Sequence, residues 1–278
     1  MKKLGALAAA LITAACSSFA GQSNPGPEPS ASAGTPKPSA TRVVPAAGKL
    51  ASTTSIVGAM REKYSGKYFR TLTFLQNNTR YTTTGEEQKS QWFEHVEAPG
   101  KLRIAFLPAA QKSGLVQVGE SVASFDNGMR IDFRPSVNPL LLLTVDAYSA
   151  PAASLMRSLD SLGVDTQIVR TDEWQGRPVY VVGAKPGDTT STQVWIDAEH
   201  LRLARFLQRV GRGERAMLSE IRVLNYREIE GYQIPTEILT LRNGRPVWRE
   251  QRTDIRLNAD LPANVFDQAL WREIPIPD

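Results

Sequence analysis

From Tyr68 to Leu257 the chain alternates apolar and polar residues in one short segment after another. A period of two places successive side chains on opposite faces of a strand, so these segments predict β-strands with one apolar face. The predicted strands are Tyr68–Leu75, Thr79–Thr84, Gln91–Glu97, Leu102–Leu107, Ser121–Phe125, Met129–Phe133, Gln167–Thr171, Val179–Val182, Gln193–Asp197, Leu203–Val210, Ala216–Tyr226, Thr236–Leu241 and Val247–Leu257. The Asn127-Gly128 pair is a strong hairpin signal because it accepts the positive φ angles of a type I′ turn. About a dozen strands joined by short turns predict a meandering antiparallel sheet that curls into a barrel or half-barrel.

Two stretches follow a helical period instead. Residues 50–64 place Ile56, Val57, Met60 and Tyr64 at helical spacing. Residues 138–163 interrupt the strands with a run of four leucines and a second helical face. We therefore predict a mainly β, α+β fold, an antiparallel open half-barrel with helices capping its concave face.

A curved sheet whose apolar concave face is only partly filled by helices leaves a hydrophobic cavity, a suitable site for an acyl chain. A fully packed core is the alternative, because periodicity does not measure packing. The tryptophans could equally be cross-strand packing partners. The residues predicted to line the cavity are Leu140, Leu143, Leu155, Met156, Leu159, Leu162, Trp92 and Trp195.

The first 20 residues read as a signal peptide. Lys2 and Lys3 precede an uncharged apolar stretch, Leu4 to Ala15, which is too short to span a membrane. The sequence Ile12-Thr13-Ala14-Ala15-Cys16 resembles a bacterial lipobox, so we predict lipidation of Cys16. Cleavage after Ala20, which would release a soluble product, is the alternative. Cys16 is the single cysteine of the chain, which excludes a disulfide framework.

Residues 21–49 are rich in Pro, Ser and Ala and predict a semi-extended linker, which leaves residues 50–278 as one domain. The formal charge of the chain is +5, and removal of Lys2 and Lys3 leaves 5 − 2 = +3. The remaining arginines are scattered, so nucleic acid is not an expected partner. We expect an exported protein of the bacterial periplasm or cell envelope, held at a membrane by its N-terminal lipid anchor.

The sequence does not predict a catalytic residue, a metal site or a cofactor. His95 and His200 are the two histidines, about a hundred residues apart, and neither belongs to a metal-ligand motif. Neighbouring residues of a strand face opposite ways, so the pair Glu94-His95 is unsuited to joint acid–base chemistry. Residues 187–191 and 197–200 are polar stretches that we interpret as turns.

Eight short motifs resemble the LolA/LolB-like superfamily of lipoprotein carriers and outer-membrane lipoprotein-sorting proteins. In chain order these are WFE at 92–94, PGKLRI at 99–104, DNG at 126–128, WQGRPVYVVGA at 174–184, VWID at 194–197, LAR at 203–205, GYQIP at 231–235 and NG at 243–244. The resemblance implies an unclosed β-barrel capped by helices, with a cavity for the acyl chains of lipids or lipoproteins and without catalytic residues. Soluble carriers of this type lack a lipobox, so Cys16 favours a fixed acceptor, or an anchored lipid-binding protein of the same fold, over a periplasmic shuttle.

We therefore expect a non-enzymatic protein that binds lipid or lipoprotein acyl chains in lipoprotein or lipid trafficking. The alternative is an envelope-anchored protein-interaction module with a packed core and no ligand.

Overall fold

The computed structural model describes residues 50–64, 66–211, 213 and 216–275, and contains a single antiparallel sheet of 13 strands. The predicted signal peptide, Cys16 and the predicted linker lie outside the described residues. The strands are β1 Thr71–Tyr81, β2 Glu87–Glu97, β3 Lys101–Phe106, β4 Gly114–Val118, β5 Ser121–Asp126, β6 Met129–Pro135, β7 Val169–Trp174, β8 Arg177–Val182, β9 Gln193–Asp197, β10 Arg202–Val210, β11 Met217–Ile229, β12 Tyr232–Arg242 and β13 Arg245–Leu257. Their order in the sheet is β6-β5-β4-β3-β2-β1-β13-β12-β11-β10-β9-β8-β7.

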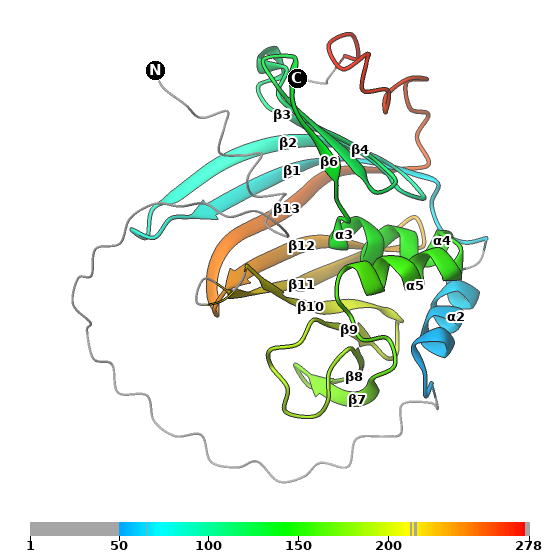
Figure 1. Ribbon diagram of the computed structural model, residues 1–278. Coiled ribbons are helices and arrows are strands. Elements are labelled where there is room, and N and C mark those ends of the chain that lie inside the picture. The colour runs from blue at the N-terminus through cyan, green and yellow to red at the C-terminus, as the bar shows by residue number, and fades with distance from the viewer. Residues whose placement is uncertain (1–49, 65, 212, 214–215, 276–278) are drawn as a thin grey trace.

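The sheet bends around its helices, as Figure 1 shows, so the predicted fold class is confirmed. The helical elements are α2 Thr53–Tyr64, the short 3₁₀ turn Ala109–Gln111, α3 Pro139–Leu141, the π-helical turn Leu142–Asp146, α4 Ala147–Ser149 and α5 Ala152–Ser161. We refer to the continuous helical stretch Pro139–Ser149 as the cover helix. It begins where the Asn138 side chain accepts hydrogen bonds from the backbone N–H groups of Leu140 and Leu141.

The N-terminal half of the sheet contains two corrections to the predicted strands. Tyr68–Leu75 and Thr79–Thr84 form one strand, β1, because the predicted break at Asn77 and Asn78 is fully paired with β2 and β13. Asn78 is buried and accepts a hydrogen bond from Gln76 Nε2 at 2.9 Å. In addition, β4 was not predicted. The hairpin at Asn127-Gly128 is confirmed, with φ angles of 49° and 75°.

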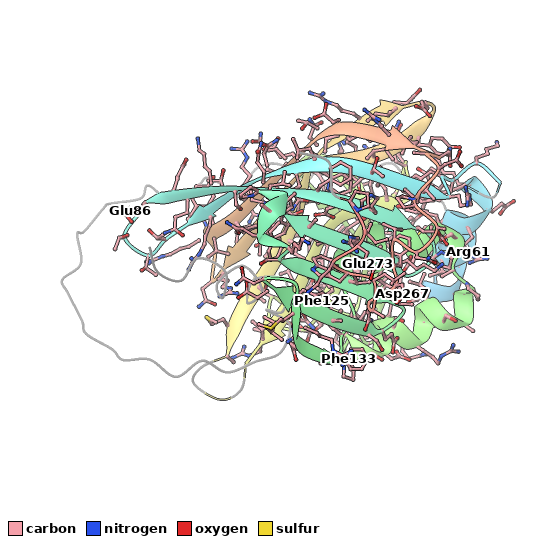
Figure 2. The ribbon with its side chains drawn as sticks, turned by 90° about the horizontal axis from the view of Figure 1, so that it is seen from above. Arg61, Glu86, Phe125, Phe133, Asp267 and Glu273 are labelled. Carbon is pink, nitrogen blue, oxygen red and sulfur yellow. The ribbon has the colours of Figure 1, made fainter. Side chains whose placement is uncertain are left out.

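The segment after β13 covers the convex face of β2–β5, which the sequence had not indicated. Trp271 stacks on Phe125 with ring centroids 4.5 Å apart. The buried Arg103 lies 4.0 Å from the Trp271 ring and donates hydrogen bonds to the carbonyls of Val265 and Trp271. In Figure 2, Asp267 of this segment lies over the same strands. This part of the sheet therefore carries a buried layer on its convex face as well as on its concave face.

Candidate ligand cavity

A cavity of about 150 Å³ lies between the concave face of the N-terminal half of the sheet and the cover helix. Strands β1, β2, β3 and β10–β13 supply its floor, and the cover helix supplies its roof. Its apolar lining is Leu72, Phe74, Trp92, Val96, Leu102, Ile104, Leu140, Leu141, Val145, Phe206, Ile221, Val247 and Trp248. Apolar cavities of this size hold a molecule as large as benzene. The cavity can therefore receive a short apolar segment as it stands, and a longer chain requires the cover helix to move.

Polar side chains also line this cavity, and we call four of them, from three adjacent strands, the polar cluster: Gln76 of β1, Glu94 of β2, and Glu250 and Arg252 of β13. The other polar residues of the lining are Asn138, Thr144, Gln208, Ser219, Thr240 and Arg242. Gln76 is paired directly with Arg252 in the sheet. Arg252 Nη2 lies 3.8 Å from Glu250 Oε2, and its guanidinium lies over the Phe74 ring. Polar groups of this kind are uncommon in an apolar interior and point to a role in binding.

Burial changes the ionisation of both carboxyl groups in the polar cluster. Loss of solvent raises the pKa of Glu94 to about 8, against a smaller opposing effect of Arg252. Burial likewise raises the pKa of Glu250. At pH 7 Glu94 is therefore mostly a neutral acid that can donate a hydrogen bond.

The cover helix is tied to the sheet by two polar contacts near its C-terminal end. The Tyr68 hydroxyl donates to the Thr144 carbonyl at 2.5 Å, and Asp146 Oδ1 accepts from the Gly100 N–H at 2.8 Å. Burial raises the pKa of Asp146 to about 6, although the hydrogen bond from Gly100 opposes the shift. The middle of the cover helix is a π-helical turn, a local departure from α geometry that often accompanies functional sites.

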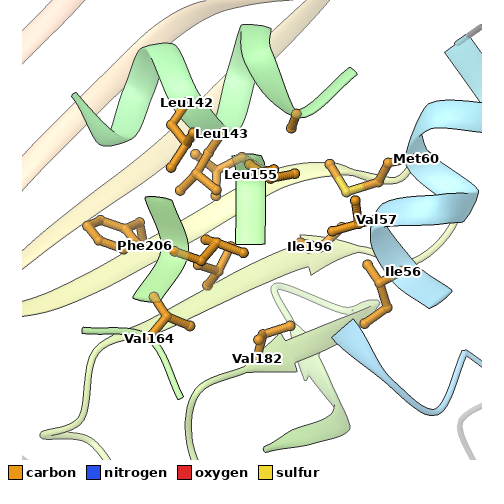
Figure 3. Close-up of a cluster of buried hydrophobic side chains, with 14 of the residues drawn as sticks. Ile56, Val57, Met60, Leu142, Leu143, Leu155, Val164, Val182, Ile196 and Phe206 are labelled. Atoms are coloured by element: carbon orange, nitrogen blue, oxygen red, sulfur yellow. The ribbon is translucent and has the colours of Figure 1, made fainter. Parts of the chain in front are cut away.

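The structure divides the eight predicted lining residues among three places. Trp92 and Leu140 line the cavity. The others on helices, Leu143, Leu155, Met156, Leu159 and Leu162, belong to a second hydrophobic cluster formed with α2 and β8–β10. Figure 3 shows this cluster, in which Ile56, Val57, Val182 and Ile196 surround Leu143 and Leu155.

The cavity expected beneath α5 is therefore misplaced. The space lined by Leu143, Leu155 and Leu159 measures only about 20 Å³, too little for a ligand. Trp195 lies on the convex face, because its strand neighbours Val194 and Ile196 point to the concave side. It contacts Trp174 edge to face at 5.6 Å, so its role in the structure is cross-strand packing.

The polar stretches considered as possible sites either form turns or have their side chains on opposite faces of the sheet. Asp197 Oδ1 accepts the N–H groups of Glu199 and His200, and Asp188 Oδ1 accepts those of Thr190 and Ser191. Glu94 faces the cavity, whereas His95 is buried on the convex face near Arg103, where burial lowers the pKa of its imidazole to about 4.

The part of the chain that the structure describes contains neither a metal-type cluster nor a membrane-spanning helix. No group of three or more His, Cys, Asp or Glu side chains there is arranged to hold a metal ion. No helix among those residues is both long enough and apolar enough to cross a bilayer.

Solved structures similar to this chain include three with the following likenesses. A LolA superfamily protein from Nitrosomonas europaea has a TM-score of 0.51 at 15% identity and covers 76% of this chain and 96% of its own. A putative outer membrane lipoprotein-sorting protein domain from Vibrio parahaemolyticus gives 0.55 at 12% identity, covering 78% and 97%. A DUF1329 family protein from Desulfovibrio piger gives 0.54 at 11% identity, covering 79% and 97%. These likenesses show a LolA-like fold.

No protein-family model and no curated protein sequence matches the chain.

Proposed function

We propose that this chain, on its LolA-like fold, is a non-enzymatic protein of the cell envelope that binds the acyl chains of lipids or lipoproteins and serves their trafficking. The observation that carries the proposal is the apolar cavity beneath the cover helix. Burial of an acyl chain contributes roughly 0.8 kcal/mol for each methylene group removed from water. A chain of ordinary length can therefore bind by apolar burial alone.

Two further observations support a binding protein over an enzyme. The polar stretches 187–191 and 197–200 are used as turns, and the cavity faces Glu94 but not His95. Burial also raises the pKa of both carboxyl groups that line the cavity, which suits an apolar ligand.

Binding is tested by titrating a series of fatty acyl probes of increasing chain length against the delipidated protein. Affinity should rise with chain length until the cavity and the space under the displaced cover helix are filled. Affinity that does not depend on chain length, or no binding at all, would refute the proposal. A Leu141→Trp variant, which fills the cavity from the cover helix, should bind more weakly, and an exposed control such as Leu224→Trp should not.

The N-terminal part of the proposal places the protein at a membrane through a diacylated Cys16, with residues 21–49 as a tether. Metabolic labelling with a fatty acid tests this in wild type and in Cys16→Ser. Labelling that disappears in the variant supports the anchor. If both proteins are equally unlabelled and equally soluble, cleavage after Ala20 is the correct reading.

A protein-interaction module remains the second candidate, because one edge of the sheet is apolar and exposed. Met129, Ile131 and Phe133 of the edge strand β6 are 60%, 53% and 57% exposed. Exposed apolar edge strands can pair with another chain. Native mass spectrometry separates the two candidates, since a co-purifying lipid supports the first and a lipid-free protein that captures a partner through β6 supports the second.

A further inference from the structure

We infer that the polar cluster of the cavity recognises the carbonyl oxygen of an acyl group, with Arg252 and Glu94 as donors to that oxygen and the hydrocarbon tail lying against the apolar lining. This inference rests on the proposed function and specifies which part of a lipid enters the cavity and how it is oriented.

The sheet places polar and apolar groups in a fixed order along the cavity floor. On β1 the concave residues run Leu72, Phe74, Gln76, so the lining changes from apolar to polar along one strand. On β2 the concave residues run Val96, Glu94, Trp92, so Glu94, which pairs with Phe74, is a polar residue between two apolar ones. An amphiphile can therefore lie with its polar end at the polar cluster and its tail toward Leu72 and Val96.

The polar cluster also contains unsatisfied hydrogen-bonding atoms. Gln76 is 2% exposed, yet its Oε1 has no partner among the described residues, and the same holds for Nε of Arg252, whose side chain is 8% exposed. An unsatisfied buried polar group costs about 1 to 3 kcal/mol. A ligand oxygen beside Arg252 Nε would remove this cost for the donor, which a hydrocarbon end cannot do.

The charges of the polar cluster favour a neutral oxygen over a phosphate. Arg252 already has a carboxyl partner in Glu250, 3.8 Å away, and burial keeps Glu94 mostly protonated at pH 7. A phosphate group at Arg252 would therefore add negative charge beside Glu250. Arg242 of β12 also lines the cavity, as a second cation. A carbonyl oxygen accepts from Arg252 and from the Glu94 acid without adding charge.

Two sources supply such a carbonyl, the ester of a glycerolipid and the carboxyl group of a free fatty acid bound in its protonated form. The experiment compares three ligands of matched length, namely methyl dodecanoate, dodecanoic acid and tridecane, by displacement of a fluorescent acyl probe from the delipidated full-length protein. One hydrogen bond to a charged donor should make at least one acyl ligand roughly tenfold tighter than tridecane. A tighter ester assigns the site to esterified lipids, and a tighter acid assigns it to free fatty acids.

The variant Arg252→Met removes the donor and retains the length of the side chain. We expect the tenfold preference over tridecane to fall below about threefold, with tridecane affinity unchanged. Arg249→Met is the matched control, because Arg249 lies on the same strand, pairs with Glu237 and does not line the cavity. It should keep the full preference. Should Arg252→Met fail to fold, Glu94→Leu serves as the second variant and should also reduce the preference.

Equal affinity of wild type for tridecane and both acyl ligands overturns the inference while leaving the proposed cavity intact. A preference that persists in folded Arg252→Met and Glu94→Leu overturns it as well. Failure of all three ligands to bind instead refutes the proposed function itself.

Discussion

Helices cover the concave face of the sheet in two regions, and the space left beneath the helices differs between them. Over β8–β10, α2 and α5 pack against the strands and leave a space of about 20 Å³. Over β1–β3 and β13, the cover helix leaves about 150 Å³. We call these the packed region and the hollow region. Close packing stabilises a fold, whereas a cavity lowers stability and leaves room for a ligand.

The two regions also differ in polar lining, which is sparse in the packed region and extensive in the hollow region. The space in the packed region is lined by apolar residues and by Thr53, whose hydroxyl donates to the Thr166 carbonyl. The hollow region contains the polar cluster, with partners missing at Gln76 and Arg252. We interpret the packed region as the source of stability and the hollow region as the site of function, in keeping with the trade-off between the two.

The substitution Leu159→Glu should have the largest effect. It places a carboxylate in the packed region, where Leu159 is 4% exposed, and should cost about 4 to 5 kcal/mol, close to the stability of an average domain. Leu140→Glu is the control in the hollow region, where the half-buried side chain borders the cavity and should cost less than half as much. Chemical unfolding measures both, and equal losses would contradict the division into two regions.

Enlarging one valine in each region gives an intermediate effect. Val182→Phe overfills the packed region and should lower the free energy of unfolding by about 1 to 3 kcal/mol. Val145→Phe points into the cavity and should be nearly neutral for stability while weakening acyl-probe binding. The comparison fails if Val145→Phe destabilises the protein as strongly as Val182→Phe.

The buried carboxyl of Asp146 should make stability depend on pH. Its pKa is about 6 in the folded state, above the ordinary value of 3.8 for an aspartate, so the folded state binds the proton more tightly. Stability therefore decreases as the pH rises from about 4 to about 6 and then levels off. Asp146→Asn keeps an oxygen for the Gly100 N–H and should gain about 1 to 2 kcal/mol at pH 7.

This gain should shrink as the pH is lowered toward 4, where wild-type Asp146 is largely protonated. Unfolding curves of the variant and wild type at several pH values test it. A gain of equal size at every pH would show that ionisation of Asp146 is not its cause.

The smallest effect is expected for His200→Ala, outside both regions. The His200 ring is partly exposed and contacts Asp197 Oδ1 at 3.2 Å, in a turn that the backbone N–H of residue 200 already supports. Stability should change by no more than about 0.5 kcal/mol, and acyl binding should be unchanged. Loss of function in the folded variant would revive a chemical role for this histidine.

The fold was largely predictable from the sequence because alternation and turn residues are local signals. The pairs Asn127-Gly128 and Asn243-Gly244 both lie at hairpin turns with positive φ. The same preference of asparagine for turns produced the false break at Asn77 and Asn78, where pairing on both sides outweighs it. The pairing of β1 with β13 joins segments far apart in the chain and leaves no local signal.

The cavity was less predictable, because alternation shows which face of a strand is apolar but not how far the opposite layer lies. Leu140 and Leu155 both belong to helical apolar patterns, yet one borders the cavity and the other lies in the packed region. Gln76 and Arg252 had no local motif either. Their position becomes apparent only when β1 and β13 bring them together on the concave face.

The pairing of β1 with β13 also has a consequence for the order in which the molecule can form. The first strand made, Thr71–Tyr81, pairs in the finished sheet with both β2 and Arg245–Leu257, the last strand made. The other pairings of the described sheet join consecutive strands, whereas this one closes a long loop whose ends must meet before the contacts stabilise them. Until β13 arrives, the open side of β1 is an unpaired edge, vulnerable to association with other chains. The edge of β1 is therefore protected only after the final hairpin has formed.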